Sequence, residues 1–265
     1  MTEPDDVEPY PTRCLRAAVD EAVAWGAQRI IAKGDLTDTG QADEFSEFAD
    51  LVLASGVPVD VILGNHDVVP EGYSGAAILR ARGLPVATRS EAIDVPGLRI
   101  VFLPSAHPDM AHDRGFWLEA DRARAIELAT AVDGPVFVAT HHYPQRFNVV
   151  TEYPSGVPRR EAKPFLDALN KAKPGAVIAC GHTHRHHRRH YKSLLITEIG
   201  STKDFPGVWA GYVVYEGGIR QVVKRVAEPS ARAWTDRTGR ALFGLWRFWA
   251  PGLRSHRCWT WEWPA

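Results

Sequence analysis

Along the chain, segments whose apolar residues recur at helical spacing alternate with short apolar runs that are typical of strands. Residues 13–25 carry apolar side chains at helical spacing, and the short apolar run at 29–32 predicts a buried strand. Further helices are expected at 40–54, 116–130 and 161–171, and further strands at 57–63, 98–103, 135–140, 176–180, 193–198, 211–216 and 219–226. Helices that alternate with strands, followed by closely spaced strands, predict an α/β fold on mixed sheets.

Four of the expected strands end in the same kind of polar side chain. The motifs that follow these strands are Gly34-Asp35, Gly64-Asn65-His66-Asp67, His141-His142 and Gly181-His182-Thr183-His184. Loops at the carboxyl ends of strands surround a common crevice in α/β sheets, and glycine lets the backbone approach a bound ion closely. One such strand end would indicate only a turn or a surface residue. Four of them, all supplying Asp, Asn or His, predict a metal site.

The ligand types narrow the choice of metal and of chemistry. Carboxylate, amide oxygen and imidazole together suit divalent ions such as Mn, Fe, Zn or Ni. A carboxylate such as Asp35 can bridge two ions, and ions ~3.5–4 Å apart typically serve the hydrolysis of phosphoesters. The pattern therefore favours a hydrolase with a dinuclear metal centre.

These motifs, in this order, resemble those of the calcineurin-like metallophosphoesterase superfamily. The stretch Gly34-Asp35-Leu36-Thr37-Asp38-Thr39-Gly40, followed by an acidic amphipathic helix, is similar to the branch that contains bacterial class III cyclic-nucleotide phosphodiesterases. The resemblance covers about residues 13–226 and implies a layered α/β/β/α sandwich with mixed β-sheets. It also implies that a metal-bound hydroxide hydrolyses phosphate mono- or diesters, with cyclic nucleotides as the first substrates to consider.

The resemblance assigns a role to each matching residue. The implied metal ligands are Asp35, Asn65, His142 or His141, His182 and His184. Asp35 would bridge the two ions, and His184 would serve the second of them. Because the family's histidine stands two residues before a proline, His142 is preferred over His141.

The resemblance also implies a general acid next to the metals. His66 would position the phosphate and protonate the leaving group, since an imidazole can hold a proton near neutral pH. Asp67 and Asp38 would orient the residues that touch metal and substrate.

One motif of the family does not occur in the chain. The family opens with Asp-x-His on its first strand, which supplies the remaining ligands of the metal that His184 serves, and no Asp-x-His precedes Gly34 here. Either the reading frame starts further upstream, or this is a natural variant with one complete and one incomplete metal site. We expect the first strand to be missing and turnover to be weak. Asp5, Asp6 or Glu8 offers a substitute carboxylate. The alternative function is that of a catalytically impaired module that binds a ligand or a partner.

Composition and charge exclude several classes of protein. Hydrophobic residues make up 45% and charged residues 24%, as in folded globular proteins. With 31 basic and 32 acidic residues, the chain offers no bulk electrostatic case for binding nucleic acid. No stretch approaches the ~18 apolar residues of a membrane span, and the first residues are acidic, unlike a secretory signal. Three widely spaced cysteines fit a reducing compartment, so we expect a cytoplasmic protein.

Three regions remain outside the motif pattern. Residues 229–265 form a tail rich in tryptophan and arginine behind a phosphoesterase domain at 1–228. This tail either contacts a membrane surface or a protein partner or folds back over an apolar face. His186, His187 and His190, each next to arginine, are expected on a solvated turn or an edge strand. The loop at 145–160, with Arg146, Arg159 and Arg160, either contacts a substrate anion or is solvated.

Overall fold

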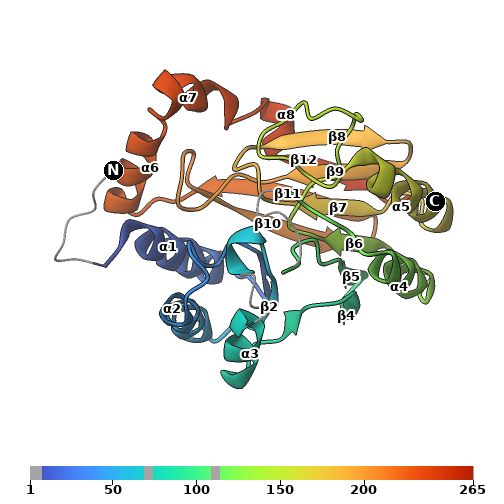
Figure 1. The fold of residues 1–265 in the computed structure, drawn as a ribbon, viewed down its shortest axis with the longest axis horizontal. Coiled ribbons are helices and arrows are strands. Elements are labelled where there is room, and N and C mark those ends of the chain that lie inside the picture. The colour runs from blue at the N-terminus through green and yellow to red at the C-terminus, as the bar shows by residue number, and fades with distance from the viewer. Residues whose placement is uncertain (1–7, 69–73, 109–113, 265) are drawn as a thin grey trace.

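In the computed structural model, which describes residues 8–68, 74–108 and 114–264, the strands form three sheets (Figure 1). The largest sheet has the order β4-β5-β6-β7-β9-β8, and its members are β4 (Glu91–Val95), β5 (Leu98–Phe102), β6 (Val136–Ala139), β7 (Val177–Cys180), β9 (Leu194–Glu198) and β8 (His187–Tyr191). Its four middle strands are parallel, and the two edge strands β4 and β8 run antiparallel to them. The expectation of a mixed sheet is therefore confirmed.

Two smaller sheets lie on one face of the six-stranded sheet. The first contains the parallel strands β1 (Ile30–Lys33), β2 (Val59–Ile62) and β3 (Val86–Ala87), and the second contains the antiparallel strands β10 (Val208–Tyr215), β11 (Gly218–Arg225) and β12 (Trp259–Glu262). Ile62 from the first sheet and Ile219 from the second share one buried cluster with Phe137 and Ala179 of the large sheet. Burial of this apolar surface is the main force that holds the sheets together.

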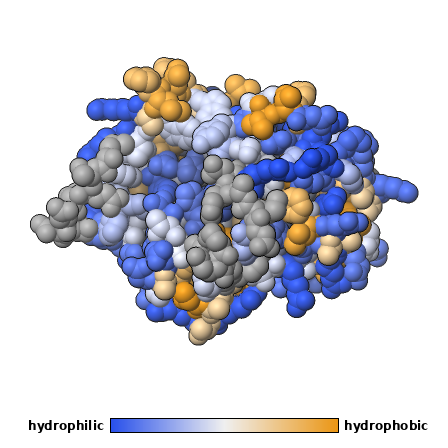
Figure 2. Space-filling view, viewed as in Figure 1, coloured by the Kyte–Doolittle hydropathy of each residue, from blue (hydrophilic) through white to orange (hydrophobic). Residues whose placement is uncertain are grey.

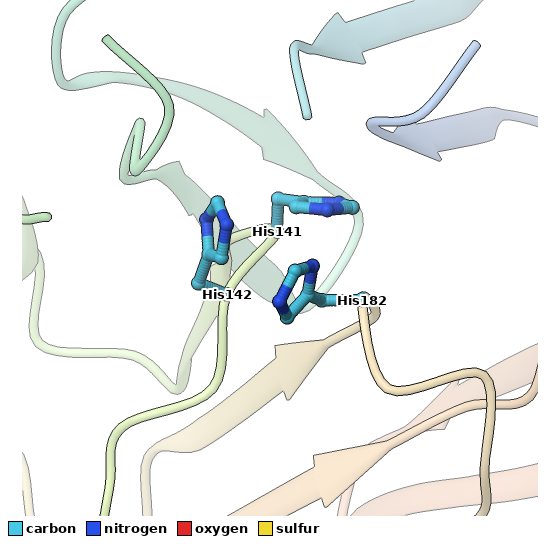
Figure 3. Close-up of side chains that lie close together, drawn as sticks. All are labelled: His141, His142 and His182. Atoms are coloured by element: carbon cyan, nitrogen blue, oxygen red, sulfur yellow. The ribbon is translucent and has the colours of Figure 1, made fainter. Parts of the chain in front are cut away.

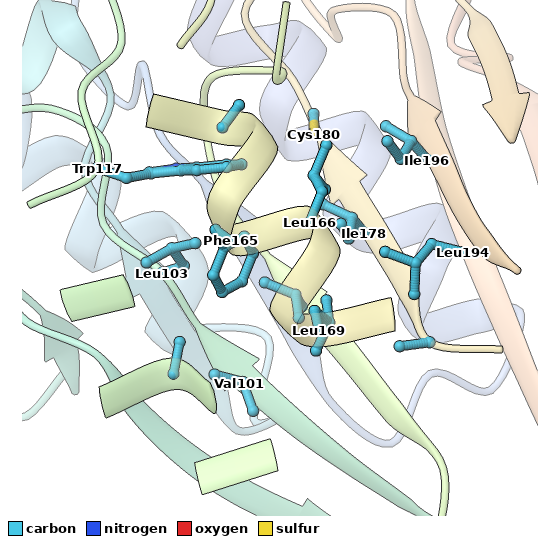
Figure 4. Packing of buried hydrophobic residues seen from close by; sticks show 14 of the residues in the cluster. Val101, Leu103, Trp117, Phe165, Leu166, Leu169, Ile178, Cys180, Leu194 and Ile196 are labelled. Carbon is cyan, nitrogen blue, oxygen red and sulfur yellow. The ribbon is translucent and has the colours of Figure 1, made fainter. Parts of the chain in front are cut away.

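Helices cover the outer faces of the sheets, which completes the expected α/β/β/α layering. They are α1 (Tyr10–Ala24), α2 (Ala42–Leu53), α3 (Ser74–Ala81), α4 (Glu119–Thr130), α5 (Arg159–Ala172) and α6 (Pro229–Thr238), with the short α7 (Leu245–Trp249) and α8 (Arg254–Arg257) near the C-terminus. On the face of the large sheet opposite the small sheets, Trp117 packs edge-on against Phe165 of α5, beside Leu169 and Ile178 (Figure 4). Among the described residues no helix is both long and apolar enough to cross a membrane.

Part of the tail folds back onto the rest of the chain. The ring of Trp234 in α6 stacks on that of Tyr10 in α1 with 4.6 Å between centroids. Strand β12 pairs with β11, and the ring nitrogen of Trp261 donates to the carbonyl of Gly175 at 2.8 Å. These contacts anchor α6 and β12 to the rest of the chain.

Candidate metal centre

The four motifs begin where β1, β2, β6 and β7 end. The backbone there is strained, because Asp35, His182 and His184 adopt positive φ angles of 54°, 67° and 53°. Non-glycine residues in this left-handed region cost of order 1–3 kcal/mol each and persist where the surrounding structure holds them. Such strain clusters at functional sites, which fits the position of all three residues in the motifs.

His141 is held in one orientation by the turn that carries Asp35. Its Nδ1 atom lies 2.7 Å from the carbonyl oxygen of Lys33, which can only accept, so Nδ1 carries the proton. The opposite nitrogen, Nε2, lies 3.1 Å from Oδ1 of Asn65 and 3.3 Å from Oδ2 of Asp35. A neutral ring therefore points a lone pair at two acceptor oxygens. A cation or a proton between these three atoms removes the repulsion.

The contact between His141 and Asp35 also shifts the pKa values of both side chains. Burial lowers the pKa of His141, but the neighbouring Asp35 carboxylate outweighs it and the pKa lies above the ordinary value. Burial raises the pKa of the Asp35 carboxyl, whereas His141, His66 and His182 together hold it well below its ordinary value. Asp35 is thus a carboxylate surrounded by groups that favour its charge.

Three buried histidines face a common space (Figure 3). His141, His142 and His182 each offer a ring nitrogen, and these nitrogens all lie within 4.8 Å of one another. The Nδ1 atom of His142 lies 2.8 Å from the hydroxyl of Ser105. Nε2 of His142 and Nε2 of His182 are buried and have no hydrogen-bond partner among the described residues. Because burying a polar atom without a partner costs free energy, these nitrogens fit the ligand shell of a cation.

Burial keeps two of these rings neutral. It lowers the pKa of His182 to about 3, with further repulsion from His141. Burial, together with repulsion from His182 and His141, also lowers the pKa of His142 well below its ordinary value. Neutral imidazole is the form that binds metals. The donor set of carboxylate, amide and imidazole therefore stands ready for a divalent ion at neutral pH.

Asp67 joins two of the motif loops from a fully enclosed position. One carboxylate oxygen accepts from the backbone amides of Leu36 and Thr37 at 2.8 and 2.9 Å and from the Thr37 hydroxyl at 3.0 Å. The other accepts from the amide of Gly64 at 2.8 Å. Burial nevertheless raises the pKa of Asp67 to about 6, helped by the nearby Asp35 charge. Three of these four hydrogen bonds come from backbone amides and none comes from the ring of His66, so Asp67 positions the loops and not that ring.

His66 and His184 lie at the edge of the histidine group. The exposed ring of His66 donates from Nδ1 to the carbonyl of Asp38 at 2.8 Å, and its backbone amide lies 3.2 Å from Oδ1 of Asp35. Nδ1 of His184 lies 2.9 Å from a carboxylate oxygen of Asp204. Asp204 was not among the residues that the sequence motifs pointed to, because it lies in an irregular loop after β9.

The structure thus brings together the ends of all four strands. Asp35, Asn65, His141, His142 and His182 gather in one place, and His184 adjoins His182. Glu8 lies elsewhere, in an ion pair with Arg16 at 2.6 Å. Asp5 and Asp6 lie outside the described residues.

A second group of acids and histidine is already balanced by a cation of the chain. Glu152, His187 and Glu198 lie close enough together to share an ion. The guanidinium of Arg185, however, lies 2.5 Å from Glu152 and 3.8 Å from Glu198. His187 bonds Glu198 at 2.9 Å. The group forms a partly buried ion-pair network. His187 and His190 lie on the edge strand β8, as expected, whereas His186 precedes the strand and is buried.

The chain is similar to known proteins in both sequence and fold. A family model described as calcineurin-like phosphoesterase matches residues 15–186. A probable cyclic nucleotide phosphodiesterase of Rhodococcus erythropolis is 27% identical over 198 residues, which are 71% of this chain and 62% of that protein. A probable glycerophosphodiester phosphodiesterase of Arcobacter nitrofigilis is 27% identical over 166 residues, 59% of this chain and 56% of that protein. The matched segments span 41–62% of the length of these and similar curated relatives.

Solved structures show the same fold at low sequence identity. A structure described as GAP50, the anchor in the inner membrane complex of Plasmodium, superposes with a TM-score of 0.55 at 12% identity and covers 84% of this chain and 82% of that one. The protein TT1561 of Thermus thermophilus gives a TM-score of 0.50 at 14% identity, with 82% of this chain and 94% of that one covered.

Proposed function

The chain belongs to the calcineurin-like phosphoesterase family, and we propose that it is a metal-dependent hydrolase of phosphate mono- or diesters. One observation carries the proposal. The Nε2 atoms of His142 and His182 are buried without partners among the described residues, while that of His141 points at the oxygens of Asp35 and Asn65. A divalent ion at this place would bind Nε2 of His182 and Nε2 of His141 together with the oxygens of Asp35 and Asn65.

We assign the first metal site to Asp35, Asn65, His141 and His182. His141 takes precedence over His142 because its Nε2 atom is directed at Asp35 and Asn65, and its Nδ1 proton is bound by a backbone carbonyl, as in most metal-binding histidines. His142 stands next to this shell and is oriented by Ser105. A divalent ion in this site supplies charge neutralisation for the phosphate and lowers the pKa of a water molecule.

The second site would use Asp35 and His184. Asp204 fixes the ring of His184 from the Nδ1 side at 2.9 Å, which leaves Nε2 to face an ion. Asp204 is half-buried, and the adjoining His184 holds the pKa of its carboxyl below the ordinary value although burial alone would raise it. A carboxylate that is hydrogen-bonded to one ring nitrogen of a histidine increases the basicity of the other nitrogen, which binds the metal.

His66 is the proposed general acid. Its Nδ1 proton is bound by the Asp38 carbonyl, so Nε2 is the ring atom that can carry a proton to a leaving alkoxide. The ring is exposed and its own backbone amide contacts Asp35, which supports a position at the edge of the proposed metal centre. Asp67 keeps the loops of Asp35 and His66 in register through its four hydrogen bonds.

Phosphodiesters are the first substrates to test, since the relatives named above are described as probable phosphodiesterases. The chain is stripped of metal with a chelator and reloaded with Mn²⁺. It is then assayed with a 3′,5′-cyclic nucleotide, a glycerophosphodiester and a nitrophenyl phosphate monoester. Hydrolysis that appears only after reloading supports the proposal. Metal binding without hydrolysis of any of these esters contradicts it and favours a module that only binds a ligand.

A further inference from the structure

Large apolar side chains are exposed together near the C-terminus. They are Leu242, Phe243, Leu245, Phe248, Trp249 and Leu253. Phe243 is 106% exposed and Phe248 83%, values that mean almost no contact with the rest of the protein. The backbone of Leu242, Phe243 and Gly244 takes positive φ angles of 51°, 56° and 86°, so a tight left-handed turn presents Phe243 outward. Figure 2 shows apolar side chains gathered along this edge, over α7 and beside α8.

A second exposed apolar segment lies in the loop before α5. Phe147, Val149, Val150 and Tyr153 are 47–76% exposed. Arg185 connects the two segments, because it pairs with Glu152 of the loop and its guanidinium lies 4.7 Å from the ring centre of Trp249 in α7. We refer to residues 147–153 and 242–253 together as the apolar face. Figure 1 shows both segments along the same edge of the molecule.

The charges along the C-terminal segment of the apolar face are of one sign. From residue 237 to residue 261 the chain contains five arginines, at 237, 240, 247, 254 and 257, and no aspartate or glutamate. Arg240 and Arg254 form no ion pair with any described residue. This arrangement attracts an anionic surface and repels a cationic one.

A basic cavity opens next to the loop of the apolar face. Its volume is about 600 Å³, and its lining includes Arg146, Phe147, Arg159, Lys163, Arg189 and His190 but no carboxylate. Lys163 is paired with Asp167 outside the lining. Arg159 and Arg189 donate to the backbone carbonyls of Arg146 and Pro144, and neither forms an ion pair with a described residue. Cationic groups around one cavity repel one another until an anion enters.

We propose that the apolar face is a docking surface for an anionic lipid bilayer, with the basic cavity taking the phosphate of a lipid headgroup. Phe243 and Phe248 would enter the acyl boundary, while the arginines contact lipid phosphates. Phenylalanine and leucine on one side with arginine around them is the composition of interfacial membrane anchors. Each basic residue near an anionic surface adds to the attraction.

Docking would place the proposed metal centre beside the lipid. The backbone amide of His186 donates to the carbonyl of Ala250 at 2.8 Å, and the ring of His182 is hydrogen-bonded to the backbone of Ser155, two residues after the other segment. Both halves of the apolar face are therefore attached to the loop that carries His182. The docking proposal rests on the exposed side chains and on the charges, and it stands independently of hydrolysis.

The test is flotation of the full chain with vesicles. Vesicles of phosphatidylcholine alone are compared with vesicles that also contain phosphatidylglycerol, at low and high salt. We expect binding only to the anionic vesicles and a decrease with salt. The double variant Phe243→Ser with Phe248→Ser should bind at least about tenfold more weakly, since two apolar rings no longer leave water. The matched control, Leu53→Ser with Leu118→Ser, changes side chains of 43% and 41% exposure elsewhere and should bind like the wild type.

Three results would overturn the proposal. The first is an absence of binding to anionic vesicles. The second is equal binding of the wild type and the Phe243→Ser, Phe248→Ser variant. The third is a wild-type dimer in size-exclusion chromatography that this variant converts to a monomer, which would assign the face to a second copy of the chain. For the cavity, Arg159→Gln should weaken vesicle binding relative to Arg160→Gln on the same helix. If inorganic phosphate alone protects the chain thermally and Arg159→Gln binds vesicles normally, the cavity serves a free anion and not a lipid.

Discussion

The Nδ1 atom of His141 lies 2.7 Å from the carbonyl oxygen of Lys33, the last residue of β1. This bond connects the six-stranded sheet to the small sheet of β1 to β3, at the residue that precedes the turn of Gly34 and Asp35. The turn permits the contact only because Gly34 has no side chain. Its φ is +87°, and a Cβ atom there would lie 2.6 Å from Nδ1 of His141. One turn thus sets both the position of Asp35 and the orientation of His141.

Replacing His141 should therefore remove more metal affinity than replacing His142. We expect His141→Ala to lower the affinity for Mn²⁺ by about 100-fold or more, and His142→Ala by a smaller factor, near the ~10–100-fold typical of residues behind the ligands. Calorimetric titration of the metal-free variants measures both. A larger loss for His142→Ala would return the ligand assignment to His142.

Asp67→Asn should destabilise the fold, although it changes only a buried side chain and leaves the protein surface as it is. The carboxylate accepts four hydrogen bonds in a buried position, and an amide nitrogen at that place would face a backbone donor. A buried group left without its partner costs about 1–3 kcal/mol, so the free energy of unfolding in urea should decrease by ~2 kcal/mol or more. Asp38→Asn, at an exposed side chain, is the control. Equal stability of the two variants would contradict the role of Asp67 as the connection between loops.

His66→Ala should lower turnover strongly and leave the metal content nearly unchanged, because His66 protonates the leaving group and does not bind metal in our assignment. Asp35→Ala, in contrast, should lose metal. The loss for His66→Ala should shrink with a nitrophenyl ester, whose leaving group needs little protonation. The readouts are metal analysis and hydrolysis rates for alkyl and nitrophenyl diesters. An equal loss with both esters would exclude His66 as the acid.

The metal-free chain should become less stable as the pH falls below about 6.5. Burial holds the pKa of His182 at about 3 in the folded chain, whereas an unfolded histidine takes up a proton near pH 6.5. Between these values the unfolded state binds a proton that the folded state does not, so stability decreases with falling pH by up to ~1.4 kcal/mol per pH unit for this residue. Urea titrations at several pH values measure the slope. The slope should be smaller in His182→Asn, and an unchanged slope would contradict a neutral buried His182.

The sequence predicts the strands and the residues at their ends well, because both depend on local features. Short apolar runs such as Val177–Cys180 followed by glycine define where a buried strand stops, and parallel strands place their carboxyl ends at one edge. The Asp35, Asn65 and His182 positions follow from this rule alone. The family match over residues 15–186 agrees with the motifs that carry the resemblance.

Other features depend on contacts that sequence patterns do not contain. His141 and His142 are neighbours of the same type, and the bond that distinguishes them comes from Lys33, 108 residues away. Asp204 contacts His184 from an irregular loop. Strand β8, with the sequence His187-Arg-Arg-His-Tyr191, shows no apolar alternation because it lies at a sheet edge. The two-residue strand β3 is too short to show any period.

The central claim is that a divalent ion held by Asp35 and His182 enables this chain to hydrolyse phosphoesters. Its most direct test is the hydrolysis of bis(4-nitrophenyl) phosphate by chelator-stripped wild-type chain, Asp35→Asn and His182→Asn as Mn²⁺ is added back. We predict that the rate of the wild type rises with Mn²⁺ and saturates, while both variants remain at the background rate. A wild-type rate that does not depend on added metal, or variants that match the wild type, would contradict the account.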